Sequence, residues 1–146
     1  MLASLFGKPI STKGTILGFP ELDDFVLVPV DESNVDSPFA YLQSVTESEV
    51  GFLVADPFAF FRDYEIKLSE QDKAALETND PQEVVVLSIV TIANPFNQST
   101  INRLAPLVVN VNKLVGIQTV LPPESAYTTR DPLFRASSPE GSEPAC

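Results

Sequence analysis

The chain has 146 residues and a formal net charge of −11, with 20 acidic against 9 basic side chains. The few basic residues are scattered and form no stripe of Lys and Arg for phosphate contacts, so direct nucleic-acid binding is disfavoured. His is absent and the only cysteine is Cys146, which excludes a His-activated nucleophile, a disulfide framework, and His or Cys metal sites. No glycine-rich phosphate-binding motif occurs, and we expect neither a cofactor nor enzymatic activity.

Eight segments are predicted to be strands, because they combine β-branched or aromatic residues with turn-forming borders. In chain order they are Thr15–Leu17, Phe25–Val30, Phe39–Val45, Gly51–Val54, Tyr64–Leu68, Val84–Ile92, Leu107–Val111 and Gly116–Leu121. The strongest signal is that of Val84–Ile92, whose apolar density predicts burial on both faces. The 13 prolines lie mostly between the apolar runs, which favours short strands joined by turns.

One short helix is predicted, with Ser69 as its N-cap and the acidic residues Glu70 and Asp72 in its first turn. A second, tighter turn is predicted over Pro57–Phe61, with Asp56 as its cap. The predicted fold class is therefore all-β: a small antiparallel β-barrel-like single domain with one short helix.

The barrel domain is expected to cover residues 1–135. Residues 136–146 contain no large apolar side chain, and we predict that they form a disordered C-terminal tail. The first residues lack the features of a signal peptide, and the longest apolar run is far shorter than the roughly 20 residues that span a bilayer. We expect a cytoplasmic monomer without membrane contact.

Two alternative functions stay open on the residues alone. A carboxylate-dependent hydrolase would use paired acids, and the candidate pairs are Asp23–Asp24, Asp31–Glu32 and Asp56 with Asp63. A single-stranded nucleic-acid-binding β-barrel would stack bases on aromatic side chains, such as Phe58, Phe60 and Phe61. Acidic loop residues are usually solvated and the net charge repels phosphate, so a protein-binding module with a basic partner is favoured.

An ordered set of residue blocks also points to a known family. The blocks are Gly14–Glu21, Phe25–Leu27, Pro38–Ser44, Gly51–Pro57, Phe60–Glu65, Val84–Thr91, Ser99–Asn110 and Gly116–Leu121, followed by Tyr127. Together they cover about residues 14–133 and resemble the FliW family of flagellar assembly factors. Two departures stand out: the segment before Gly14 is short for the family, and Asn102-Arg103-Leu104 is one residue longer than the family motif, which predicts a small bulge.

The resemblance implies a compact β-barrel-like fold and a regulatory protein with two competing protein partners. One partner is a CsrA-type RNA-binding regulator, whose repression of flagellin mRNA translation such a protein antagonises. The other partner is flagellin. By linkage, each partner must weaken the binding of the other.

We hypothesise a partner-binding surface where acids border apolar or aromatic side chains, and its members are Glu21, Asp23, Asp24, Asp63, Glu65, Phe19, Phe58 and Phe60. The alternative is a solvated loop residue for each acid and core packing for each aromatic. A second set matches family-motif positions: Gly18, Leu42, Gln43, Ser44, Asp56, Pro57, Tyr64, Asn102, Ala105, Pro106, Asn110 and Gln118. Its amide side chains are interpreted first as fold determinants that bond turn backbones.

Overall fold

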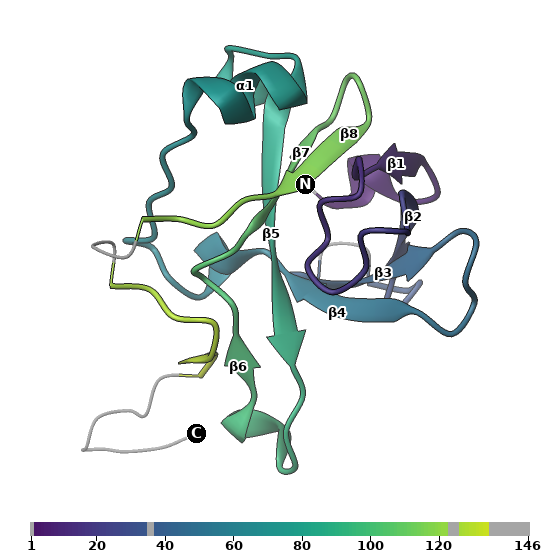
Figure 1. The fold of residues 1–146 in the computed structure, drawn as a ribbon. Coiled ribbons are helices and arrows are strands. Elements are labelled where there is room, and N and C mark those ends of the chain that lie inside the picture. Colours follow the sequence, from purple (N-terminus) through teal and green to yellow (C-terminus); the bar gives the residue numbers. More distant parts are fainter. Residues whose placement is uncertain (1, 35–36, 123–125, 135–146) are drawn as a thin grey trace.

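A computed structural model describes residues 2–34, 37–122 and 126–134, and its main feature is a β-barrel with one short α-helix at one end (Figure 1). The strands are β1 (Pro9–Ser11), β2 (Asp24–Pro29), β3 (Phe39–Ser44), β4 (Gly51–Ala55), β5 (Val84–Thr91), β6 (Thr100–Ile101), β7 (Leu107–Asn110), β8 (Val115–Gln118) and β9 (Asp131–Pro132). The all-β, barrel-like prediction is confirmed. The predicted C-terminal tail lies outside the described residues.

Seven strands close the barrel in the order β4, β3, β2, β1, β8, β7, β5 and back to β4, while β6 and β9 extend the sheet beyond β5. Every pairing between these strands is antiparallel except that of β1 with β8, where Ser11 lies parallel to Val115. The antiparallel prediction is therefore wrong at this one seam. The reason is geometric, because a closed ring with an odd number of strands cannot alternate direction at every pair.

The core has two layers, one inside the barrel and one on its outer face. Strand β5 contributes to both, since successive side chains point to opposite faces of a sheet. Val85 and Leu87 join the inner cluster with Phe25, whereas Val86 and Val90 join the outer cluster. Burial of this segment on both faces is thus confirmed.

The helix α1 (Glu70–Leu76) begins as predicted. The Ser69 hydroxyl accepts the N–H of Asp72 at 3.0 Å, and the Asp72 carboxylate accepts the N–H of Ser69 at 3.3 Å, which completes a reciprocal cap. The predicted turn after Asp56 is the 3-10 helix η2 (Pro57–Ala59), and Asp56 caps it. The other 3-10 turns are η1 (Leu2–Leu5), η3 (Pro81–Glu83) and η4 (Phe96–Gln98).

Two predicted strands are wrong. Thr15–Leu17 lies in the connection between β1 and β2, where the N–H of Leu17 bonds the side chain of Gln118 instead of a neighbouring strand. Tyr64–Leu68 is in none of the strands, although its composition fits one. Three strands were not predicted, namely β1, β6 and β9, because each has only two or three residues and depends on distant partners.

The two departures from the family pattern have clear places in the fold. The short segment before Gly14 still supplies η1 and β1, and β1 pairs on both sides. The backbone N–H groups of Arg103 and Leu104 both donate to the carbonyl of Thr128, at 3.1 and 3.2 Å. The extra residue therefore lies in the connection between β6 and β7, and the predicted strand bulge is wrong.

Buried amides tie the turns to the barrel. The Asn110 side chain donates to the carbonyl of Leu76 at 2.7 Å and accepts two N–H groups from the β7–β8 turn. The Gln118 side chain donates to the carbonyl of Ala105 at 3.0 Å and accepts the N–H of Leu17 at 2.8 Å. These bonds satisfy buried backbone groups that would otherwise lower stability.

Candidate functional site

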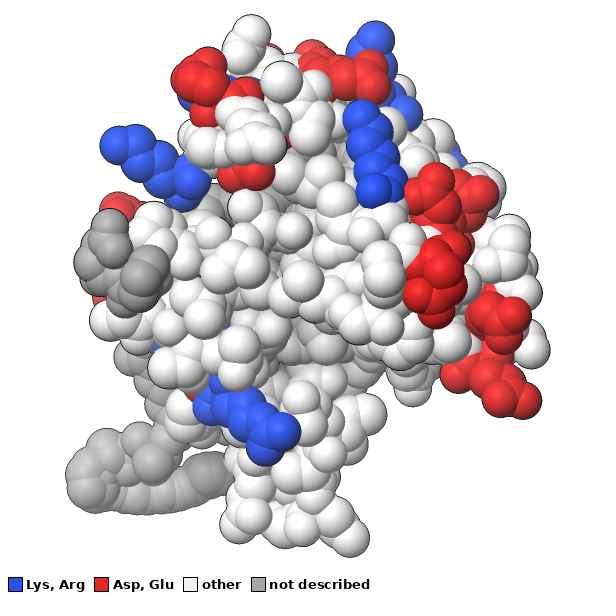
Figure 2. Space-filling view, in the orientation of Figure 1, with Lys and Arg blue, Asp and Glu red and all other residues white. Residues whose placement is uncertain are grey.

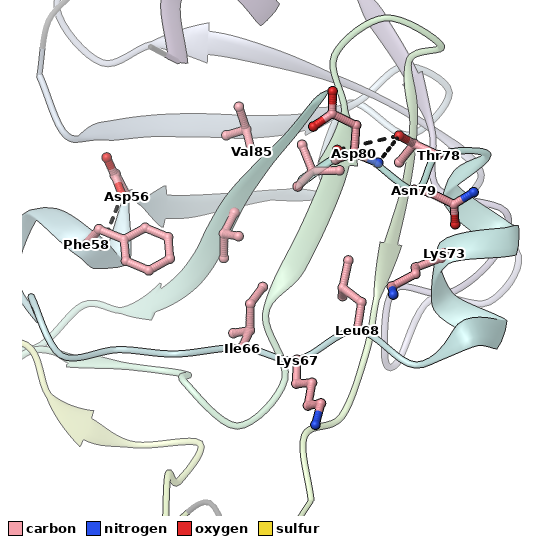
Figure 3. Close-up of a pocket in the computed structure, with 12 residues that line it drawn as sticks. Asp56, Phe58, Ile66, Lys67, Leu68, Lys73, Thr78, Asn79, Asp80 and Val85 are labelled. Carbon is pink, nitrogen blue, oxygen red and sulfur yellow. Dashed lines mark hydrogen bonds between the residues drawn. The ribbon is translucent and has the colours of Figure 1, made fainter. Parts of the chain in front are cut away.

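A groove of about 690 Å³ lies beside β5, between this strand, α1 and the extended residues 66–68 (Figure 3). Apolar residues form most of its walls, namely Phe58, Ile66, Leu68, Val84, Val85 and Val86. Figure 3 shows Ile66 and Leu68 directed toward β5, whereas Lys67 points away from it. The volume falls within the range of about 300–1,000 Å³ that is usual for ligand sites.

The edge of β5 that borders this groove carries backbone groups without a partner. On the opposite edge, the carbonyl of Glu83 accepts the N–H of Val111 at 2.9 Å, so the odd-numbered residues of β5 bond toward β7. Alternate residues of a strand bond to opposite sides, and Val84 and Val86 therefore direct their N–H and C=O groups toward the groove side. The 3-10 helix η3 (Pro81–Glu83) takes up the N–H of Val84 in its last turn, so within the described chain the C=O of Val84 and the N–H and C=O of Val86 have no hydrogen-bond partner on that side.

Strand β4 stops before it covers this edge. Its pairing with β5 ends at Ala55 and Ser88, and the same register would place Pro57 opposite Val86. Proline has no N–H to donate to a ladder. Asp56 also begins the 3-10 helix η2 at this point, which ends the ladder with β5 although η2 stays in contact with that strand. The local sequence Asp-Pro therefore leaves the end of β5 unpaired.

The charged groups around the groove balance one another. Two carboxylates, Asp56 and Asp80, and two ammonium groups, Lys67 and Lys73, line it. Both carboxylates already accept backbone N–H groups in the turns that they begin, and Lys73 lies 3.3 Å from the carboxylate of Glu70. The groove is thus suited to an apolar ligand rather than to a strongly charged one.

Three of the predicted partner-binding acids gather at one end of the barrel. Asp24 opens β2, and its carbonyl accepts the N–H of Val45 at 3.0 Å, which places the start of β2 next to the β3–β4 turn. We call this region the acidic end, and its members are Glu21, Asp23, Asp24, Glu47 and Glu49, all of which are exposed. Figure 2 shows acidic side chains gathered on the side of the molecule where the β3–β4 turn lies. Within the described residues, none of these five carboxylates forms an ion pair.

The other two predicted acids, Asp63 and Glu65, lie elsewhere. They are exposed on the connection between η2 and α1, on the opposite side of the barrel from β2 (Figure 1). The backbone N–H of Glu65 donates to the hydroxyl of Tyr127 at 3.1 Å. The structure therefore divides the hypothesised surface into two separate acidic regions.

The three predicted aromatics differ in exposure. Phe19 is partly buried and packs edge to face on Phe52, with ring centroids 5.6 Å apart. Phe60 is also partly buried and contacts the rings of Phe39 and Phe134. Phe58 is 42% exposed and lines the groove, and its ring centroid lies 5.6 Å from that of Tyr64. Of the three, Phe58 is placed to meet a partner.

Most of the family-motif residues serve the fold. Gln43 donates to carbonyls of the β3–β4 turn, Asn102 accepts the N–H of Ala105 at 2.9 Å, and Gly18 adopts a positive φ of 89° in a turn. Asp56 caps η2, as described above. The buried members are Leu42, Ser44, Pro57, Tyr64, Ala105, Pro106, Asn110 and Gln118.

The groove beside β5 brings together none of the acid pairs considered for hydrolysis. Asp56 lines the groove but Asp63 does not. Asp31 is exposed, and hydrogen bonds from the hydroxyl and the N–H of Ser33 lower its pKa. The described residues also bring together no group of three or more His, Cys, Asp or Glu side chains that could hold a metal ion. None of the described helices is long and apolar enough to cross a bilayer.

A buried charged cluster was missed at the sequence level. The guanidinium carbon of Arg103 lies 3.9 Å from the ring centre of Phe61 and 4.8 Å from that of Tyr127. The Tyr64 hydroxyl donates to the backbone carbonyl of Arg103 at 2.7 Å, and burial, reinforced by Tyr127, raises the pKa of Tyr64. Arg103 also pairs with Asp131. No local pattern marks this cluster, because its members are far apart in the sequence.

The fold and these two surfaces define a mixed seven-stranded β-barrel with one short helix, an apolar groove beside β5 and an acidic end. The family model described as FliW protein matches residues 7–133. The chain belongs to the FliW family of flagellar assembly factors.

Individual relatives and a solved structure agree with this assignment. The flagellar assembly factor FliW of Bacillus subtilis (strain 168) is 44% identical over 118 residues, which cover 81% of this chain and 80% of that protein. The Bacillus licheniformis flagellar assembly factor FliW is 42% identical over 126 residues, covering 86% of this chain and 85% of the relative. A crystal structure of a flagellar assembly factor FliW superposes with a TM-score of 0.80 at 35% identity, covering 88% of this chain and 87% of the other.

Proposed function

We propose that this chain binds a CsrA-type RNA-binding regulator in the cytoplasm, antagonises its repression of flagellin mRNA translation, and binds flagellin as the alternative partner. Membership of a family of flagellar assembly factors supports a role in flagellum biogenesis. The observation that carries the regulatory part is the acidic end, because its exposed carboxylates have no ion-pair partner within the described residues.

The acidic end supplies a physical route to antagonism. A regulator that binds RNA presents basic groups to phosphates, and complementary charge raises its rate of association with an acidic protein. Once bound, the carboxylates of Asp23 and Asp24 bring negative potential close to the surface that RNA phosphates approach. RNA binding is then weakened by electrostatic repulsion, whether or not the two footprints overlap.

Calorimetry with purified CsrA and purified flagellin tests the proposal. We expect both proteins to bind the chain at micromolar concentration or below, and we expect saturation with flagellin to weaken CsrA binding. A gel-shift assay with CsrA and a flagellin leader RNA should show loss of the CsrA–RNA complex when the chain is added.

The same assays identify the alternatives. Tight binding of single-stranded RNA by the chain alone would favour the nucleic-acid-binding barrel and contradict our proposal. Failure to bind either protein at micromolar concentration, with the chain folded by circular dichroism, would also overturn it.

A further inference from the structure

We propose that the groove beside β5 is a docking site for an extended segment of a partner protein, which adds to the unpaired edge of β5 as a further strand. This inference does not depend on the identity of the partner proposed above. It rests on a juxtaposition of unpaired backbone and apolar side chains within one groove.

The backbone of β5 fits an incoming strand. Val86 presents its N–H and C=O groups to the groove side and Val84 presents its C=O group, in the alternation of a β-ladder. Peptide strands that add to an exposed sheet edge obtain affinity from such main-chain hydrogen bonds. The free portion of β5 runs only from its first residue, Val84, to the residue before Ser88, where pairing with β4 begins, so the added strand is expected to be correspondingly short.

The wall opposite β5 has the same extended character. Residues 66–68 run along the groove without a strand partner in the described chain. Their side chains alternate, since Ile66 and Leu68 point toward β5 and Lys67 points away (Figure 3). Phe58 adds an exposed ring at one end of the groove. A strand on β5 would thus direct every second side chain onto an apolar surface.

These features select one kind of occupant. Residues 136–146 of this chain carry no large apolar side chain and so lack the groups that would fill the groove. A small apolar molecule would leave the N–H and C=O groups of Val86 and the C=O group of Val84 without partners. An extended peptide with apolar residues at alternate positions satisfies both the backbone and the walls.

The groove and the acidic end differ in their net charge. The groove is lined by two carboxylates and two ammonium groups, so its net charge is close to zero. Binding there should depend only weakly on ionic strength, whereas contacts at the acidic end should be screened by salt. Salt dependence therefore reports which of the two surfaces a ligand uses.

The test uses a phage-displayed library of random dodecapeptides, selected on the full chain and counter-selected on its Phe58→Asp variant. We expect the enriched peptides to alternate apolar and polar residues. Their affinity, measured by fluorescence anisotropy, should fall at least about tenfold for Phe58→Asp and for Ile66→Asp. N-methylation of alternate peptide residues should cause a similar loss, because it removes the donors of the ladder. Exchange of the Val86 amide hydrogen should slow in the complex.

Phe96→Asp is the matched control, since Phe96 is also 42% exposed but lies outside the groove. It should leave the affinity within about twofold of the original chain. Phe58 is a surface residue, so its variant tests the site even if Ile66→Asp fails to fold. The proposal is overturned if no peptide distinguishes the chain from its Phe58→Asp variant, if N-methylation has no effect, or if light scattering shows a groove-dependent dimer of the chain instead.

Discussion

Nε of Arg103 donates a hydrogen bond of 2.9 Å to Oδ2 of Asp131, and the side chains are only 16% and 12% exposed. Asp131 also accepts the N–H and the hydroxyl of Thr128. This pair therefore fastens the last described segment of the chain, including β9, to the connection before β7. It joins residues 28 positions apart.

Replacing Asp131 with Asn should destabilise the fold, because it leaves the mostly buried guanidinium of Arg103 without a counter-charge. We expect a loss of about 3 kcal/mol in the free energy of unfolding in urea. The exposed pair between Lys73 and Glu70 supplies the control, since Lys73→Ala should change stability by less than about 1 kcal/mol. Equal effects of the two substitutions would refute a special role for the Arg103–Asp131 pair.

Stability should fall at alkaline pH because of Tyr64. Burial raises the pKa of its hydroxyl above the ordinary value of about 10. Above that pH the unfolded state loses a proton that the folded state keeps, so the free energy of unfolding decreases as pH rises. Tyr64→Phe should lose about 1 kcal/mol at pH 8 with its hydrogen bond to Arg103.

Between about pH 10 and pH 12, the Tyr64→Phe variant should show a flatter decline of stability, because a titrating group is gone. Thermal unfolding followed by circular dichroism measures both curves. Tyr41→Phe is the control, since Tyr41 is exposed on the outer face of β3. The idea is wrong if the Tyr64→Phe curve is as steep as that of the original chain.

Charge reversal at the acidic end should weaken binding to CsrA. The double variant Asp23→Lys with Asp24→Lys reverses two charges in a region that also holds Glu21, Glu47 and Glu49. We expect affinity to fall by about tenfold at low ionic strength and by less at high salt, where exposed charges are screened. Calorimetry at two salt concentrations measures the difference.

The second acidic region provides a comparison with the same change of net charge. Asp63→Lys with Glu65→Lys should alter CsrA affinity by less than about threefold, because the structure places these acids on the other side of the barrel. Equal losses in both double variants would point to net charge rather than to the acidic end. No loss in either would remove electrostatics from the explanation.

The buried side chain of Asn110 is expected to stabilise the fold. Its side chain is fully buried and joins the end of α1 to the β7–β8 turn through three hydrogen bonds. Asn110→Ala should lower the free energy of unfolding by about 2–3 kcal/mol, as buried backbone groups lose their partners. Exposed Asn112→Ala should change it by less than about 0.5 kcal/mol. Urea titrations that show no difference would contradict this role.

The parts of the fold that could be predicted are those with local signals. Neighbouring residues specify three such features: the β-branched run of β5, the helix cap at Ser69 and the turn at Asp56-Pro57. Strands β1, β6 and β9 could not be predicted, because two or three residues carry no periodicity and are held by distant partners. Residues 66–68 look like a strand in composition, but they border the groove without pairing.

The candidate surfaces were predictable only in part. Glu21, Asp23 and Asp24 were predicted individually, but Glu47 and Glu49 were not, because their proximity depends on how the start of β2 lies against the β3–β4 turn. The groove depends on where β4 stops, which Pro57 determines only once the register with β5 is known. The register between strands that lie far apart in the sequence cannot be derived from local residue patterns.

The parallel seam between β1 and β8 consists of one residue pair, Ser11 with Val115, and the N–H of Ser11 bonds the carbonyl of Leu114 at 3.0 Å. Few bonds need to break for the ring to part at this point, so transient opening costs least free energy there. We expect the Ser11 amide to exchange its hydrogen faster than the amides at the centre of β5. The barrel should therefore open transiently between β1 and β8, while the strands from β2 to β5 stay paired and move as one curved sheet.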